Sequence, residues 1–158
     1  MKLQDIVVED AILPDLNATE RDAAIAEIID AVIAAGALSQ SLRDEFIKAI
    51  IKREKRGSTG FGHGVAVPHV KHPAIRKMAV AVAVSRGGID FNALDKQPVY
   101  SIFLLLSPED KPEDHLDAMV AIFGSLSQET FRRFLKQAAS VEDVKTLLEE
   151  ADSRATTR

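Results

Sequence analysis

Apolar residues recur every three or four positions in two stretches of the first third of the chain, a spacing typical of one face of a helix. In TERDAAIAEIIDAVIAAG, we expect Thr19 to cap the start of the helix and Gly36 to end it. In SQSLRDEFIKAIIKREKRG, Ser39 or Ser41 is the expected cap and Gly57 the stop. The pattern therefore predicts two amphipathic helices ahead of Gly57.

In the middle of the chain the period of the pattern changes from that of a helix to that of a strand. The segments GVAVPH, KMAVAVAVS and PVYSIFLLLSP are short apolar runs, and proline ends the first and bounds the last. In KMAVAVAVS valine alternates with alanine, so both faces are apolar, as in a strand that is covered on both sides. Near the start of the chain, IVVEDAIL can add an edge strand.

Three more helical patterns close the chain: PEDHLDAMVAIFGSLS, which starts near Pro112, then SQETFRRFLKQAA, and SVEDVKTLLEEA, which Ser140 can cap. Two helices, a cluster of strands and three helices predict an α/β fold, in which a small mixed β-sheet is sandwiched between helices in a single domain. We place this domain at residues 1–150 and expect residues 151–158, ADSRATTR, to form a flexible tail.

Composition and charge narrow the classes of function. A length of 158 residues suits one domain with a real core, and a net charge of −4 argues against nucleic acid as a partner. The absence of cysteine excludes disulfides, thiolate metal sites and cysteine nucleophiles. No signal-peptide core is visible, and no apolar run approaches the ~20 residues of a membrane span. We therefore expect a cytoplasmic protein without membrane insertion.

The stretch GSTGFGHGVAVPHVKHP holds three of the four histidines of the chain. His69 follows Pro68, which stops the predicted strand and stiffens the backbone ahead of the histidine. We therefore expect the imidazole at a sheet edge, within reach of solvent, where it can be a base, a metal ligand or a nucleophile. The alternative is an ordinary histidine of a surface loop.

Arg53 shares the inward face of the second predicted helix, because it lies close to three helical turns after Leu42. An arginine that points toward the body of the protein needs an anionic partner, and no acid shares its face one turn away. The alternative is an arginine that snorkels at the helix end, where its charge favours the last carbonyl groups.

His115 heads the inward stripe of a later helix, which continues through Met119, Ile122 and Leu126. A helix N-terminus disfavours the imidazolium form and offers N–H groups to anions. A neutral histidine at this position can donate a hydrogen bond to a phosphoryl oxygen. The alternative is a histidine at the edge of the core.

The loop GSTGFGHG supplies further candidates, since its glycines allow a ligand to approach closely and Ser58 and Thr59 offer hydroxyls to a phosphate. The loop matches no nucleotide-binding pattern. We expect His63 and His72 to be exposed loop residues. The spacing of His63, His69 and His72 fits no common zinc pattern, so we predict neither a metal nor a cofactor.

The segment REKRGSTGFGHGVAVPHVKHP closely resembles the signature of the type-2 IIA domains of the bacterial phosphoenolpyruvate-dependent phosphotransferase system. This fructose/mannitol family includes nitrogen-regulatory IIA proteins. The elements of the signature are Arg53–Glu54, Ser58–Thr59, the strand from Val65 to His69, and a later His115–Leu116 pair. The order of the predicted helices and strands is also similar across nearly the whole chain.

The resemblance implies a mechanism and its residues. His69 would accept a phosphoryl group from a phosphohistidine on an HPr-type carrier protein, with Arg53 lining the site and His115 as a second histidine that is not phosphorylated. No metal or cofactor is needed. The family often has glycine after the proline–histidine pair, where this chain has Val70, and a larger residue there can narrow the access of the carrier.

Three interpretations of the function are open at this point. We favour a stand-alone IIA of the nitrogen-regulatory type that acts on regulatory target proteins, because no fused membrane domain and no IIB-type cysteine are present. The alternative is a sugar-specific (fructose/mannitol) IIA that passes its phosphate to a separate IIB protein for sugar uptake. The third is an unrelated α/β domain with an incidental site.

Overall fold

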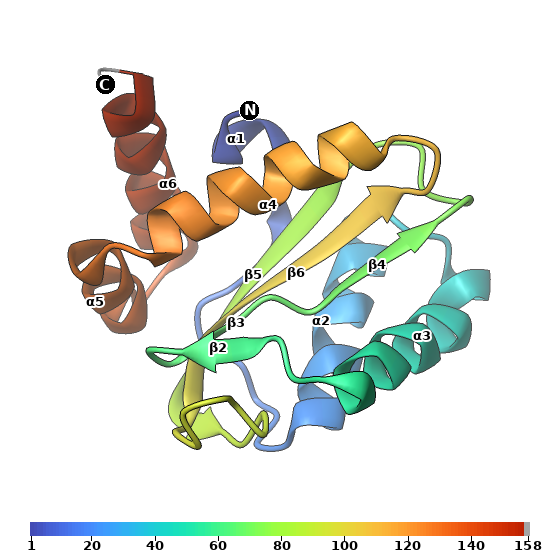
Figure 1. Ribbon diagram of the computed structural model, residues 1–158, viewed down its shortest axis with the longest axis horizontal. Helices are drawn as coiled ribbons and strands as arrows, with labels where there is room; N and C mark the ends of the chain where they lie inside the picture. Colours follow the sequence, from blue (N-terminus) through green and yellow to red (C-terminus); the bar gives the residue numbers. More distant parts are fainter. Residues whose placement is uncertain (157–158) are drawn as a thin grey trace.

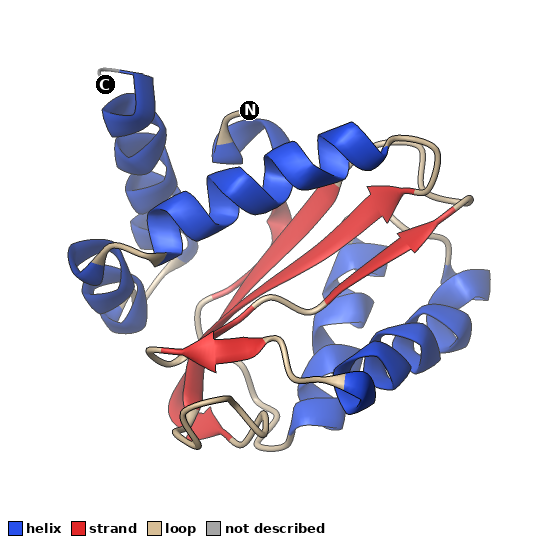
Figure 2. Ribbon diagram, in the orientation of Figure 1, coloured by secondary structure: helices blue, strands red, loops and turns tan. Residues whose placement is uncertain are grey.

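A computed structural model describes residues 1–156, in which helices flank a central group of strands (Figures 1 and 2). The helices are α1 (Leu3–Ile6), α2 (Arg21–Ala34), α3 (Arg43–Arg56), α4 (Pro112–Leu126), α5 (Glu129–Gln137) and α6 (Val141–Thr156), and the 3-10 turn η1 (Gln40–Leu42) precedes α3. The strands are β1 (Val7–Leu13), β2 (Gly60–Gly62), β3 (Val65–Ala66), β4 (His69–His72), β5 (Ala79–Ile89) and β6 (Val99–Pro108).

The elements form three layers with the sheet in the middle, which confirms the predicted α/β fold. Helices α2 and α3 cover one face of the sheet, while α1, α4, α5 and α6 lie toward the other (Figure 1). The sheet is mixed: β1 is parallel to β5, β5 is antiparallel to β6, and β3 and β4 are both parallel to β6. Each face of the sheet contributes to its own hydrophobic core.

The strand β5 shows how the sequence pattern builds both cores. Its first six residues are all buried, and alanines face the core under α2 and α3 while valines face the core under α4, α5 and α6. These residues alternate in the order Ala79, Val80, Ala81, Val82, Ala83 and Val84. Because side chains alternate between the faces of a strand, the valine–alanine repeat sets up two apolar faces at once.

Pro68 interrupts the edge of the sheet without ending it. The strand β3 stops before Pro68, and a second short strand, β4, begins directly after it on the same side of β6. Proline has no N–H for the ladder, but its carbonyl oxygen still accepts a hydrogen bond from the Leu105 N–H, at 2.9 Å. The predicted strand therefore ends before Pro68 as expected, but the sequence did not predict the new strand that begins at His69.

The strand β2 pairs with β3 through a two-residue loop of His63 and Gly64. Both loop residues have positive φ, 60° at His63 and 76° at Gly64, as in a type I′ hairpin turn. Glycine suits position 64, because residues with a Cβ rarely adopt a positive φ. His63 is unusual because it adopts a positive φ although it has a Cβ.

Helix boundaries agree with the pattern to within a few residues. The cap of α2 is Glu20 and not the expected Thr19, while Gly36 follows the helix with a φ of 81°. Ser39 is a cap as predicted, but of η1, where its hydroxyl accepts a hydrogen bond from the Ser41 N–H. Gly57 ends α3.

Residues 151–156, which the sequence pattern assigned to a flexible tail, continue α6 as far as Thr156. Asp152 is buried, and its carboxylate accepts hydrogen bonds from the backbone N–H groups of Leu3, at 2.7 Å, and Gln4, at 3.0 Å. The carboxylate thus satisfies free N–H groups at the start of α1 and ties the two ends of the chain together. Residues 157–158 of the expected tail lie outside the described residues.

Candidate functional site

His69 opens β4 next to Leu105 of β6 and is half-buried. Its Nδ1 lies 2.9 Å from the carbonyl oxygen of Val67. Because a carbonyl oxygen only accepts, Nδ1 must carry the hydrogen, which leaves Nε2 with a free lone pair. Burial lowers the pKa of His69; the Val67 carbonyl opposes this effect, and the positive charge of Arg53 lowers the pKa further. At neutral pH His69 is therefore a neutral imidazole with a nucleophilic Nε2.

His115 lies in the first turn of α4, and its ring centroid is 5.5 Å from that of His69. Only 9% of its surface is exposed, and its Nδ1 lies 2.6 Å from the hydroxyl oxygen of Ser107. Burial first, and then the charges of Lys71 and His69, lower the pKa of His115 to about 4. The two histidines thus form a neutral pair, although many residues separate them in the sequence.

The register of the sheet explains why the pair forms. The core under α4 contains Val65, Val67 and Leu105, so alternate residues of this edge face α4. His69 continues this alternation beyond Pro68, and the chain turns after β6 directly into α4, which carries His115 back over the same face. The end of β6 and the start of α4 therefore bring the second histidine to the first.

Arg53 lies at the end of its helix, as the second of the two interpretations from the sequence describes. In the last turn of α3, its Nη1 donates a hydrogen bond of 2.7 Å to the carbonyl oxygen of Gly57, just past the helix end. Its positive charge also lowers the pKa of His69, so the guanidinium lies within electrostatic reach of the imidazole. The arginine thus stabilises the end of α3 and places a cation near His69.

The hydroxyls of Ser58 and Thr59 have protein partners. Ser58 donates to the carbonyl oxygen of Phe91 at 2.6 Å and accepts from the Gly60 N–H at 3.0 Å. The hydroxyl and the N–H of Thr59 both donate to the buried carboxylate of Glu54. These bonds hold the loop between α3 and β2, and the predicted role of both residues as phosphate ligands stays a prediction.

Val70 and the glycines of the loop serve packing in this structure. Val70 points away from His69 and packs against the core under α2 and α3, so its side chain does not narrow the approach to the imidazole. At Gly60, a Cβ would lie 2.9 Å from the Cβ of Ala93, so glycine allows the loop to pass close to that residue. The expectation that Val70 narrows carrier access is not supported.

His63 and His72 lie outside the pair. His63 is exposed in the hairpin turn, where its backbone N–H donates to Asp95 at 3.3 Å. His72 accepts from the Ala74 N–H through Nδ1, and its Nε2 contacts the carboxylate of Glu45. The ring of His72 also packs on Phe46, so this histidine is only partly exposed. Neither contacts His69 or His115 through any of these bonds.

Two residues of the site were missed by sequence reasoning. Lys71 lies two residues after His69 on the same strand and hence on the same face, and its charge lowers the pKa of both site histidines. Ser107 lies opposite Lys71 in the register of β4 and β6. Extending the strand past Pro68 in the sequence would have found Lys71, but no sequence signal pointed to Ser107.

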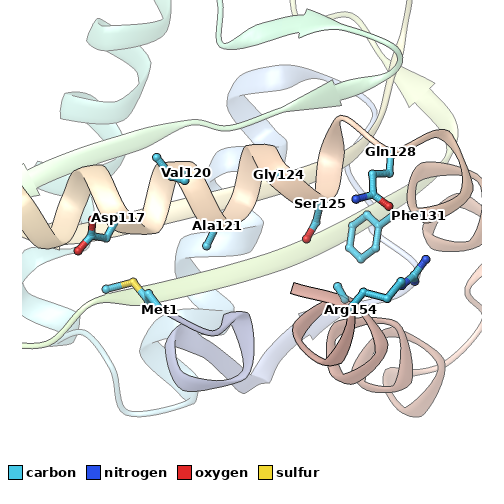
Figure 3. A pocket seen from close by; sticks show the side chains of 10 residues that line it. Met1, Asp117, Val120, Ala121, Gly124, Ser125, Gln128, Phe131 and Arg154 are labelled. Carbon is cyan, nitrogen blue, oxygen red and sulfur yellow. The ribbon is translucent and has the colours of Figure 1, made fainter. Parts of the chain in front are cut away.

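A pocket of about 490 Å³ lies elsewhere, between α4, α5, α6 and Met1 (Figure 3). Val120, Ala121 and Phe131 are among its lining residues, which include none of the predicted site residues. In the part of the chain that the structure describes, no cluster of three histidine or acidic side chains can hold a metal ion. Among residues 1–156, no helix has the length and apolar character to cross a membrane.

Fold and site together define a small α/β domain that presents a neutral histidine, backed by a second histidine and cations, on a sheet edge. The sequence model of the phosphoenolpyruvate-dependent sugar phosphotransferase system, EIIA 2, matches residues 5–151. The chain therefore belongs to the type-2 IIA family of that system, as the sequence resemblance predicted.

The chain is similar both to nitrogen regulatory proteins and to fructose-specific components of the phosphotransferase system. A nitrogen regulatory protein of Bradyrhizobium diazoefficiens is 35% identical over 148 residues, which cover 94% of this chain and 95% of that protein. A fructose-specific EIIA component of Haloferax volcanii is 37% identical over 130 residues, which cover 82% and 83%. The chain spans only 24% of a fructose-specific EIIABC component of Bacillus subtilis, to which it is 29% identical.

Solved structures share the fold. The crystal structure of nitrogen regulatory protein IIA-Ntr from Neisseria meningitidis has a TM-score of 0.82 and 31% identity, with 90% of this chain and 96% of that chain covered. A complex of enzyme IIAMTL with phosphorylated enzyme IIBMTL from Escherichia coli has a TM-score of 0.73, with 90% and 95% covered. At 20% identity, the second likeness shows the fold alone.

Proposed function

We propose that this protein is a cytoplasmic phosphohistidine carrier, which accepts a phosphoryl group on Nε2 of His69 from a phosphohistidine of an HPr-type protein. The observation that carries the proposal is the bond from Nδ1 of His69 to the Val67 carbonyl, which leaves Nε2 as the free nitrogen. In the step, the Nε2 lone pair forms the new N–P bond while the N–P bond to the donor imidazole breaks, and the donor leaves with that electron pair.

Surrounding groups support this step without a metal. The Val67 carbonyl accepts the Nδ1–H, which becomes more positive as Nε2 is phosphorylated. Arg53, Lys71 and His115 supply positive charge or a hydrogen-bond donor for the phosphoryl oxygens. Ser58 and Thr59 hold the loop beside the site through their bonds to Phe91 and Glu54, and a contact of their hydroxyls with the phosphoryl group stays a prediction.

The function is tested by incubating the protein with phosphoenolpyruvate, enzyme I and an HPr-type carrier, and by measuring an acid-labile mass gain of one phosphoryl group. We expect His69→Ala to abolish the gain and His72→Ala, a matched change on the same strand, to retain it. Undiminished labelling of His69→Ala would overturn the assignment of the nucleophile. No labelling of the unaltered protein with its own donors would overturn the carrier function.

We further propose that its output is regulatory, of the nitrogen type. The support is that the nitrogen regulatory structure from Neisseria meningitidis is similar to this chain over nearly its whole length, at 31% identity. The second candidate, passage of the phosphate to a separate IIB protein for sugar uptake, is favoured by the fructose-specific relative. Incubation of the phosphorylated protein with fructose- and mannitol-type IIB proteins separates the two, because a sugar-specific IIA transfers its phosphoryl group rapidly to its own IIB.

A further inference from the structure

Ser107 is a fully buried polar residue at the end of β6, in a strand that is otherwise largely apolar. Its hydroxyl oxygen lies 2.6 Å from Nδ1 of His115 and 3.0 Å from the sulfur of Met78. A hydroxyl carries one hydrogen, so it can donate to only one of these two atoms at a time. The state of His115 and the direction of this hydrogen are therefore linked.

Two arrangements satisfy all of these groups. In the first, the Ser107 hydroxyl donates to Nδ1, and His115 is neutral with its hydrogen on Nε2. In the second, Nδ1 carries a hydrogen and donates to the Ser107 oxygen, whose own hydrogen then turns to the sulfur of Met78. An imidazole nitrogen is a far better acceptor than a thioether, so the first arrangement is favoured while His115 is neutral.

The first arrangement suits the proposed chemistry, on which this inference rests. Ser107 occupies Nδ1, so Nε2 is the nitrogen of His115 that is left for a group on His69, whose ring lies 5.5 Å away. With its hydrogen on Nε2, His115 donates to a phosphoryl oxygen. With the hydrogen on Nδ1 alone, it would turn a lone pair toward that oxygen and repel it.

The second arrangement matters when His69 carries a phosphoryl group. The titratable groups near His115 are Lys71 and the His69 ring on β4, and Glu113 and Asp114 lie exposed in the first turn of α4. A phosphoryl group adds up to two negative charges on the His69 side and favours a positively charged His115. Met78 then takes the hydrogen of Ser107, so that both nitrogens of His115 can donate.

We infer that Ser107 is a positioning residue that places the hydrogen of His115 on Nε2, and that Met78 is the reserve acceptor that allows His115 to take up a proton when His69 is phosphorylated. Neither residue touches the phosphoryl group. Both act through the second histidine, and a residue that only fills space would not control where the His115 hydrogen lies.

The test uses nitrogen NMR of the full chain, which distinguishes the two neutral tautomers of His115, together with the initial rate of phosphoryl acceptance. For Ser107→Ala, we expect the Nε2–H tautomer to lose its dominance and the rate to fall about three- to tenfold, as for one lost positioned hydrogen bond. Ser107→Thr should restore both. The control is Ser101→Ala, which removes another buried hydroxyl about 20 Å back along the same strand.

Met78→Leu separates the two arrangements. We expect it to leave the tautomer of the unphosphorylated protein unchanged and to lower the pKa of His115 in the phosphorylated protein. An unchanged tautomer in Ser107→Ala would overturn the inference, and so would an unchanged pKa in Met78→Leu. The tautomer is read without any phosphoryl donor, so a protein that keeps the Ser107 effect but accepts no phosphate would contradict the proposed function alone.

Discussion

The four histidines form two contrasting groups. His69 on β4 and His115 in the first turn of α4 lie side by side, and the Nδ1 of each is close to an oxygen of the sheet, the Val67 carbonyl or the Ser107 hydroxyl. His63 and His72 belong to the same short stretch as His69, but they lie in a hairpin turn and against Glu45. A histidine thus becomes a candidate nucleophile through the group that binds its second nitrogen and leaves the other nitrogen available, and not through its neighbours in the sequence.

The largest difference in the rate of phosphoryl acceptance should be that between variants of His115 and variants of His63. We expect His115→Ala to slow phosphoryl acceptance about 100-fold, because the site loses a donor to the developing charge of the phosphoryl group. His63→Asn should stay within about twofold, since asparagine tolerates the positive φ of the turn. Initial rates with a phosphorylated carrier measure both variants, and equal rates would remove the distinction between the two groups.

Lys71 should show a smaller effect that depends on salt. We expect Lys71→Met to slow acceptance about three- to tenfold at low ionic strength, because the cation lies beside both site histidines. The difference from the unaltered protein should shrink in high salt, which screens an exposed charge. Lys77→Met, an exposed lysine beyond the end of β4, is the control. A loss of the same size in the control would mean that general charge attraction, and not the site, is responsible.

The pH dependence of stability sharpens the contrast further. The pKa values of His69 and His115 are lowered in the folded protein, so both histidines bind protons more readily in the unfolded chain. The free energy of unfolding therefore decreases as the pH falls. Their contribution to stability is full above the unfolded pKa of about 6.5 and is lost as the pH falls toward about 4, the pKa of His115. We expect the Tm to drop by several degrees over this window, and His115→Gln to flatten that drop. An equal drop in the variant would show that other groups cause it.

The smallest effect concerns the turn. His63→Gly should raise the free energy of unfolding by about 0.5 kcal/mol, because glycine adopts the positive φ without strain, although it loses more freedom on folding. His63→Val should lower it by about 1–2 kcal/mol, since a β-branched residue is strained there. Denaturant unfolding measures both changes, and phosphoryl acceptance should be unaltered. A stabilising valine would contradict the assigned role of the turn.

Much of the fold could be predicted from the sequence, because the relevant signals are local. The alternation of valine and alanine in β5 and the helical stripe behind His115 both depend on periods of a few residues. The new strand at His69 was missed. Proline lacks an N–H and so interrupts the hydrogen-bond ladder at its own position, but it does not show whether the next residues pair again with the neighbouring strand, as β4 does with β6. The helical course of residues 151–156 was missed because Asp152 is satisfied by N–H groups at the other end of the chain.

The chain by itself determined the α/β layers, the family signature and the choice of His69 and His115 as candidates, since each follows from residue type and short spacing. Only the tertiary structure decided that the two rings lie 5.5 Å apart, that Val70 faces the opposite core, and that Ser58 and Thr59 have protein partners. It also decided that Ser107 holds His115. The reason is physical: the position of a hydrogen on an imidazole, and the burial that keeps the ring neutral, depend on atoms brought in by distant strands and helices.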